Sequence, residues 1–142
     1  MSEGAGGIGR SIGAVLAGVV VAVLCVMAIE SLGQRIYPPP PGMEPSNIES
    51  VRAAMKNIPT GALLFLLAAW LLGTVAGSAV AARIARQRPV MHAMIIGMVQ
   101  LAFGVFNLVM FPHPLWFAVT GVALMLPAAW VGARLVRRAQ AA

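Results

Sequence analysis

Glu30 is the residue best suited to chemistry inside a membrane, because it is the acidic residue that lies closest to a long apolar run. A carboxylate at such a position is a candidate proton carrier or general acid. Arg35 and Tyr37 follow within a few residues. If the three side chains converge, they predict a cleft for a lipid-soluble substrate. The alternative is that Glu30 reaches the lipid headgroups or forms an ion pair with Arg35 or Arg52.

The other reactive residue types form no recognisable catalytic or metal-binding pattern. The chain has one cysteine, Cys25, inside an apolar run, and two histidines, His92 and His113, at opposite ends of another run. It has no aspartate, no HExxH motif, no phosphate-binding loop and no pair of carboxylates within one run. We therefore predict no catalytic residues, no bound metal and no cofactor, and we do not expect an enzyme.

Two amide side chains, Gln100 and Asn107, share one face of the helix that their spacing predicts. An amide that faces lipid leaves its donors unpaired, so this face is expected to point into a helix bundle. Thr74, Ser78 and Thr120 are the candidate hydrogen-bond partners. Two interpretations remain open: hydrogen bonds that only hold helices together, or a small polar pocket or conducting path.

These residues must be positioned by membrane-spanning helices. Of the 142 residues, 60% are hydrophobic and 10% are charged, and the mean hydropathy is +0.88. A soluble domain typically has about 45–50% apolar and about 25% charged residues, so an ordinary soluble domain is excluded. Crossing about 30 Å of hydrocarbon takes about 20 helical residues, and four runs are long enough: about 11–32, 60–82, 90–111 and 114–134. We predict one all-α domain over residues 1–142, a polytopic membrane four-helix bundle.

The net charge of +6 is explained by cations at the ends of the spans rather than by binding to nucleic acid. Cytoplasmic segments of membrane proteins are enriched in lysine and arginine. Most of the cations would lie on one side of the membrane: Arg10, Arg83, Arg86, Arg88, Arg134, Arg137 and Arg138. We therefore expect both termini to be cytoplasmic and the segment from about 33 to 59 to be extracytoplasmic. The lipid bilayer is the expected partner, and nucleic acid is not.

The segment between the first two spans contains a short helix of its own. Pro38 to Pro41 predict extended polyproline II, which Gly42 ends. Ser46 to Glu49 form a predicted capping box that begins a helix over about 46–57. Its apolar residues lie on one face and its charges on the other. We expect an amphipathic helix that lies on the outer membrane surface or caps the bundle.

The same segment carries a resemblance to known proteins. The sequence Glu30-Ser31-Leu32-Gly33, followed by Ile36-Tyr37 and the run from Pro38 to Gly42, resembles a pattern in small, uncharacterised bacterial membrane proteins with four spans. The resemblance implies a location in the bacterial inner membrane. It implies no activity, and no catalytic residue is transferred with it.

A stripe of small residues marks the second span as a packing surface. Ala69, Gly73, Gly77 and Ala81 are spaced four apart and therefore follow one face of a helix. Small side chains let another helix backbone approach closely. The approaching helix is either another span of the same chain or the same stripe of a second copy, which would give a homodimer.

The sequence favours a structural or accessory subunit of a membrane assembly, because packing signals are strong and no catalytic set is present. The alternative is a small dimeric transporter or channel that uses Glu30 and the face of Gln100 and Asn107. A cavity that joins Glu30 to these two amides would favour the alternative. In either case the protein partner is a second copy or another membrane protein.

Cysteine labelling tests the predicted orientation. In a Cys25→Ala variant that also carries Ser46→Cys, a membrane-impermeant maleimide added to intact cells is expected to label the protein. The reason is that residue 46 lies in the predicted extracytoplasmic segment. Labelling that occurs only from the cytoplasmic side would reverse the orientation.

Overall fold

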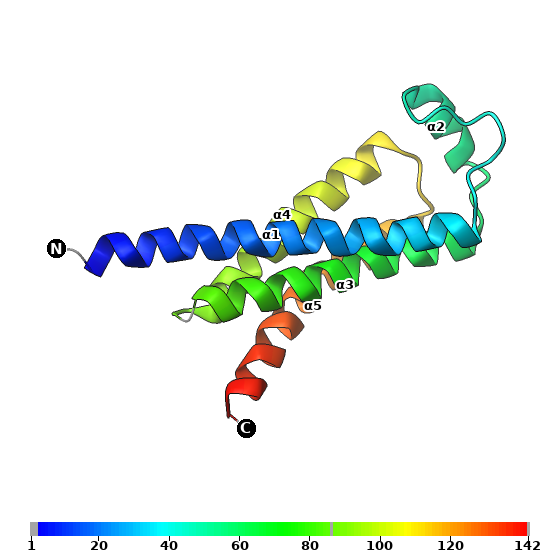
Figure 1. Ribbon diagram of the computed structural model, residues 1–142. Coiled ribbons are helices and arrows are strands. Elements are labelled where there is room, and N and C mark those ends of the chain that lie inside the picture. Colours follow the sequence, from blue (N-terminus) through cyan, green and yellow to red (C-terminus); the bar gives the residue numbers. More distant parts are fainter. Residues whose placement is uncertain (1–2, 86, 142) are drawn as a thin grey trace.

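The computed structural model describes residues 3–85 and 87–141, which form five helices and no strand. The helices are α1 (Glu3–Ile36), α2 (Ile48–Met55), α3 (Thr60–Ala85), α4 (Pro89–Met110) and α5 (Leu115–Ala141) (Figure 1). The predicted all-α class is confirmed. Arg86, one of the cations that predict the orientation, lies outside the described residues.

Four of the helices are long and apolar enough to cross a membrane: Gly7–Ile36 within α1, Thr60–Ala85, Pro89–Met110, and Leu115–Ala139 within α5. They match the four predicted spans, and the chain is a small multi-pass integral membrane protein. Both α1 and α5 continue beyond the predicted limits. The apolar pattern marks only the part that suits hydrocarbon. At the end of α5, alanine and arginine are good helix formers that extend the helix past it. The extension at the start of α1 contains four glycines, so helix propensity does not explain it.

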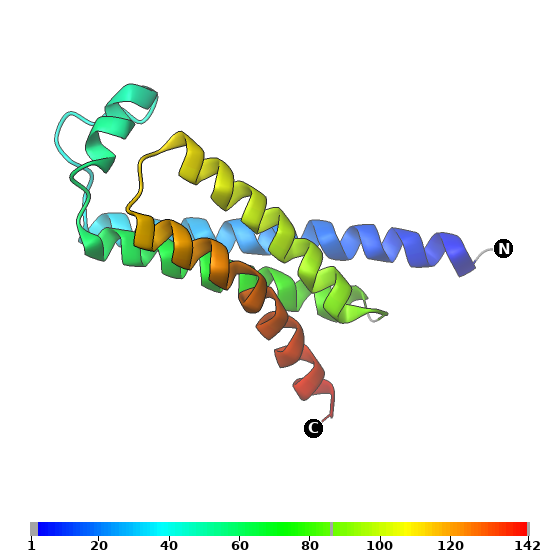
Figure 2. The ribbon, with the colours of Figure 1, turned by 180° about the vertical axis from the view of Figure 1, so that it is seen from behind.

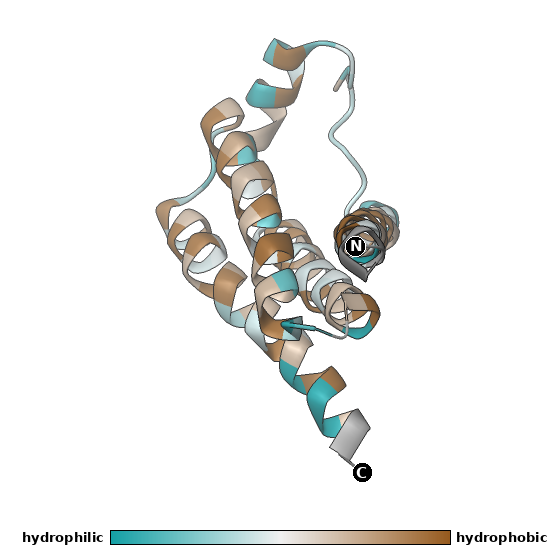
Figure 3. Ribbon diagram, turned by 90° about the vertical axis from the view of Figure 1, so that its left-hand side faces the viewer, coloured by the Kyte–Doolittle hydropathy of each residue, from teal (hydrophilic) through white to brown (hydrophobic). Residues whose placement is uncertain are grey.

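The central helix of the bundle is α3. On one side α1 runs alongside it (Figure 1), and on the other side α4 and α5 pack on α3 and on each other (Figure 2). Hydrophilic residues gather at α2 and towards the end of α5, whereas the helices between are largely hydrophobic (Figure 3). The turn between α3 and α4 lies at the end of the bundle opposite α2 (Figure 1).

Small residues form the seam between α1 and α3. A Cβ added to Gly77 would meet the Gly18 carbonyl oxygen and would lie 2.7 Å from the Cβ of Ala22. A Cβ added to Gly73 would lie 2.6 Å from Val26 and 2.9 Å from the Ala22 carbonyl oxygen. The seam therefore has room only for glycine hydrogens at these two positions, and the two backbones approach closely.

The small-residue stripe of α3 thus packs inside the chain. Ala69 and Ala81 are fully buried, and Gly73 and Gly77 face α1. A homodimer built on the same stripe would have to displace α1. A Cβ added to Gly132 of α5 would meet the backbone of α3 in the same way, and no stripe of small residues in the sequence predicts this second seam.

The loop before α2 turns at Gly42. The φ angle of Gly42 is +84°, and the Met43 N–H donates to the Pro40 carbonyl oxygen at 3.2 Å. These are features of a type II turn, in which a proline suits the first central position and glycine supplies the positive φ of the second. The run of prolines therefore ends where the sequence predicts.

The N-terminal cap of α2 differs from the predicted one. The N-cap is Asn47 rather than Ser46, and its side-chain oxygen accepts hydrogen bonds from the backbone N–H groups of Glu49 (3.0 Å) and Ser50 (3.3 Å). The Glu49 carboxylate pairs with Arg52 at 3.0 Å instead of closing a capping box. The helix covers Ile48–Met55 rather than the predicted 46–57. Its start differs because serine and asparagine are equally good caps and their order in the sequence does not decide between them. At its other end Lys56 and Asn57 form a turn before Pro59.

One face of α2 packs against the end of the bundle. The Nε–H of Arg52 donates to the carbonyl oxygen of Met110, the last residue of α4, at 2.8 Å. Met55 and the following Ile58 pack against a buried cluster of Leu63, Leu67, Trp70, Phe117 and Met125. These side-chain contacts fit a helix that caps the bundle, and a position on the outer membrane surface stays a prediction.

Gly77→Ala is expected to destabilise the bundle by about 1–3 kcal/mol, because the added Cβ overlaps the α1 backbone. The matched control is Gly13→Ala, which places the same methyl group where nothing lies within 4 Å. In this control the free energy of unfolding should rise by about 0.5–1 kcal/mol, because alanine favours a helix more than glycine does. Reversible unfolding in mixed detergent micelles measures the free energy of unfolding of both variants. Equal changes in Gly77→Ala and Gly13→Ala would contradict close packing at the seam.

Candidate functional site

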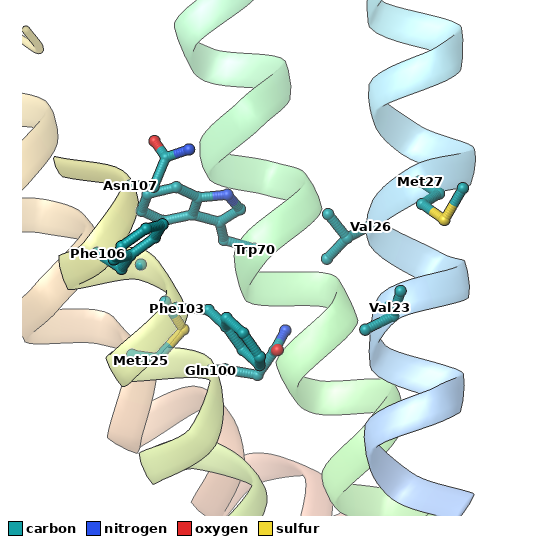
Figure 4. Close-up of a pocket in the computed structure, with 10 residues that line it drawn as sticks. Val23, Val26, Met27, Trp70, Gln100, Phe103, Phe106, Asn107 and Met125 are labelled. Atoms are coloured by element: carbon teal, nitrogen blue, oxygen red, sulfur yellow. The ribbon is translucent and has the colours of Figure 1, made fainter. Parts of the chain in front are cut away.

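A cavity of about 300 Å³ lies where α1, α3, α4 and α5 meet. Three of its lining residues carry polar side-chain atoms: Trp70, Gln100 and Asn107. The others are Val23, Val26, Met27, Phe103, Gly104, Phe106 and Met125 (Figure 4). An apolar wall with a few polar groups is typical of binding pockets.

The cavity exists because α1 and α4 both pack on α3 but separate from each other towards α2 (Figure 1). Trp70 of α3 is 8% exposed and packs edge-to-face on Phe117, with 5.3 Å between ring centroids. Gly104 makes room for the indole, since a Cβ there would lie 3.3 Å from it, whereas a Cβ at Gly121 would lie 3.4 Å away, in ordinary van der Waals contact. A glycine of α4 therefore lets Trp70 lie close against that helix in the cavity.

The cavity opens sideways between α1 and α4. Three of its lining residues are largely exposed: Met27 of α1 (58%), and Phe103 (60%) and Phe106 (64%) of α4. These are apolar residues on spanning helices, so the surface around the opening faces lipid tails. We call the cavity and its opening the lateral groove.

Gln100 is a buried polar residue that faces the lateral groove. It is 8% exposed as a residue, and its amide atoms keep some exposure in the groove, because the fully buried unpaired atoms of the described residues are Asn107 Oδ1 and His113 Nε2 and not those of Gln100. Figure 4 shows its amide on the side of α4 that faces α3 and α1. Gln100 lies near the midpoint of α4, so in a bilayer it is roughly 15 Å from either edge of the hydrocarbon layer. An unpaired amide there costs about 1–3 kcal/mol.

Asn107 lines the same groove further along α4. Its Oδ1 atom is buried and has no hydrogen-bond partner in the described part of the chain. The face that the spacing of Gln100 and Asn107 predicts therefore leads into one cavity. The interhelical hydrogen bond that is one interpretation of these amides is not formed at Asn107 Oδ1 within residues 3–85 and 87–141.

The three hydroxyl groups expected to bind these amides form other hydrogen bonds. Thr74 and Thr120 each donate to the carbonyl oxygen four residues earlier, both at 2.7 Å, and Ser78 donates to the Ala93 carbonyl oxygen at 3.1 Å. For Thr74 and Thr120 the expectation is wrong because a carbonyl oxygen one turn back is already within reach of a helical hydroxyl. Ser78 does bond to α4, but to its backbone rather than to an amide side chain.

Glu30, Arg35 and Tyr37 do not line the lateral groove. Glu30 is half-buried and has no ion pair with another described residue, and its candidate partner Arg52 pairs with a different carboxylate. Arg35 is exposed, and the Tyr37 ring packs edge-to-face on Phe65, with 6.1 Å between centroids. The structure therefore brings Gln100 and the second amide together but leaves these three residues apart from them.

His113 is a further residue of interest, which the sequence analysis does not single out as a site. It lies in the linker between α4 and α5, and its ring stacks on Phe117 with 4.9 Å between centroids. Its Nδ1 lies 2.9 Å from the Phe111 carbonyl oxygen, so the proton is assigned to Nδ1, and the buried Nε2 has no partner among the described residues. Burial lowers the pKa of His113, and the bond to Phe111 opposes this effect. His113 lies between Pro112 and Pro114 in the sequence. Because proline restricts the backbone φ angle, this pattern indicates that the position of His113 is fixed.

Comparison of the chain with protein-family models, with curated proteins and with solved structures found no match. In the part of the chain that the structure describes, no group of three or more His, Cys, Asp or Glu residues is placed to hold a metal ion. Function must therefore be inferred from the lateral groove itself.

His113 should make the stability of the bundle depend on pH. Its pKa is lower in the folded protein than the ordinary value of 6.5, so the unfolded state binds more protons as the pH falls below that value. Its stabilising contribution is complete above the ordinary pKa and is lost as the pH falls through the folded pKa. Thermal unfolding in detergent between about pH 8 and pH 5 should show this loss.

The matched control is His113→Asn, whose amide keeps a donor near the Phe111 carbonyl oxygen but does not titrate. Its stability should depend less on pH than that of the natural protein. Identical pH profiles for the two proteins would rule out His113 as the source.

Proposed function

We propose that this protein is an accessory subunit of a membrane assembly, and that its lateral groove receives a polar side chain from a partner's transmembrane helix. The observation that carries the proposal is Gln100, a buried amide near mid-membrane depth that faces a groove opening towards lipid. Such an amide is stabilised when another helix supplies a donor or an acceptor.

A polar side chain on a helix suits the groove better than a lipid does. Lipid tails have no hydrogen-bonding groups, and lipid headgroups lie far from the midpoint of α4. A helix with one polar residue on an apolar face matches the lining, which is apolar apart from Trp70, Gln100 and Asn107. Because an amide both donates and accepts, Ser, Thr, Asn or Gln on the partner would serve.

The partner is a second copy of this chain or a different membrane protein. Two Gln100 amides that meet across a two-fold axis satisfy each other, since each supplies a donor and an acceptor. A dimer of this kind would use the opening of the lateral groove. It would leave the stripe of α3 covered by α1, as it is within one chain.

The assembly is proposed to lie in the bacterial inner membrane, with both termini in the cytoplasm. The resemblance of the Glu30–Gly42 segment supports this location. The exposed arginines at the end of α3 and near the end of α5 support the orientation, because both helix ends lie opposite α2 (Figure 1).

The alternative, a small dimeric transporter or channel, is favoured by the fact that Gln100 and Asn107 line one cavity. Proton coupling would require Glu30 to join that cavity, and the lining does not include Glu30. We therefore prefer the accessory role, in which the groove binds a partner rather than a passing solute.

Photocrosslinking from the opening of the groove tests the proposal. A photoreactive phenylalanine derivative replaces Phe103, and intact membranes are irradiated before analysis on denaturing gels. A discrete crosslinked band is expected, at twice the mass of the chain for a second copy and at another mass for a different partner. Adducts with lipid alone would refute the accessory role.

Gln100→Met separates partner binding from folding. Methionine has nearly the length of glutamine and removes the unpaired amide, so the isolated protein should become more stable by about 1 kcal/mol. At the same time the crosslinked band should weaken strongly. Met98→Leu, on the exposed face of α4, is the matched control. It should change neither the stability of the isolated protein nor the intensity of the crosslinked band. A band that persists unchanged in Gln100→Met would show that the amide does not hold the partner.

A further inference from the structure

A second cavity, of about 460 Å³, lies between α2 and the end of α4. One wall carries Glu49, Arg52 and Ala53 of α2 together with Lys56, which follows the helix. The other wall is the end of α4 and the start of the next linker, Leu108 to Pro112. One side of this cavity is therefore charged and the other apolar. We call it the α2 cleft.

Arg52 is held in place in the α2 cleft by two contacts. Its Nε–H donates to the Met110 carbonyl oxygen at 2.8 Å, and a terminal nitrogen donates to Glu49 at 3.0 Å. Since Met110 is the last residue of α4, the guanidinium lies at the level where the span ends. A guanidinium has five N–H donors in a planar fork, so donors remain for a further anion.

Lys56 supplies a second cation to the α2 cleft. It is exposed and has no ion pair with a described residue, whereas the one acid of the lining, Glu49, is paired with Arg52. The lining therefore carries net positive charge. A lysine ammonium is a point charge on a flexible stem, which suits a phosphate whose position is set mainly by other contacts.

We propose that the α2 cleft binds the phosphate headgroup of an anionic phospholipid, with Arg52 and Lys56 at the phosphate and the acyl chains along Leu108 and Val109. Phospholipid phosphates lie just outside the hydrocarbon layer, which is the level at which α4 ends. The two-sided lining also favours a lipid, because a free phosphate has no apolar part to place against the end of α4. Val109 is 76% exposed, so this wall is open to the surrounding tails.

Thermal unfolding of the full chain in mild detergent tests this proposal. Phosphatidylglycerol is titrated into the protein, with phosphatidylcholine as the zwitterionic comparison and glycerol phosphate as the free headgroup. Phosphatidylglycerol should raise Tm at a lower concentration than phosphatidylcholine, and glycerol phosphate should leave Tm unchanged. Equal stabilisation by glycerol phosphate would assign the α2 cleft to a soluble anion and overturn the lipid proposal.

Charge variants separate this site from general attraction to anionic lipid. Lys56→Gln should raise the phosphatidylglycerol concentration for half-maximal stabilisation about fivefold. Glu49→Gln removes the acid of the lining and should lower this phosphatidylglycerol concentration. Arg35→Gln is the matched control, because Arg35 is a cation near the same end that does not line the α2 cleft. Equal effects of Lys56→Gln and Arg35→Gln would overturn the site. Arg52 is not substituted in this test, because it also joins α2 to α4.

Discussion

The close approach of the α1 and α3 backbones at Gly18, Gly73 and Gly77 is the contact on which the rest of the structure depends. In lipid no hydrophobic effect draws helices together, so close packing of small residues has to supply the association. α1 packs mainly on α3, while many of its large apolar side chains are exposed. Because α1 forms one wall of the lateral groove, this seam also sets the shape of the candidate site.

The fold class and the number of spans follow from the sequence because a bilayer imposes one length scale and requires each helix to pair its own backbone groups. Details that depend on competition between similar groups do not follow. Ser46 and Asn47 are both good helix caps, and only the structure distinguishes them. The stripe of α3 predicts a close helical neighbour but not its identity, since a second copy and another span give the same sequence pattern.

The candidate site is predictable where it depends on one helix and unpredictable where it depends on several. The spacing of Gln100 and Asn107 fixes their shared face, and both line the lateral groove. The close packing of Trp70 depends on Gly104 of another helix, α4, which a local pattern does not reveal. The three candidate residues around the end of α1 are close in sequence but do not share one surface. Glu30 and Arg35 lie on different faces of α1, and Tyr37 follows the end of the helix and packs on Phe65 of α3. Proximity along the chain therefore does not bring them into one cleft.

The length of α1 has a consequence for the membranes that this protein can occupy. Its 34 residues span roughly 51 Å, against about 30 Å of hydrocarbon. α1 is packed from about Ala14, which is fully buried, to Gly33, where an added Cβ would lie 3.0 Å from Phe65, whereas nothing would lie within 4 Å of a Cβ added at Gly7, Gly9 or Gly13. Differences in bilayer thickness are therefore accommodated by submerging more or fewer of these first turns. Hydrophobic mismatch is absorbed at one free helix end, and the packed helices keep their arrangement.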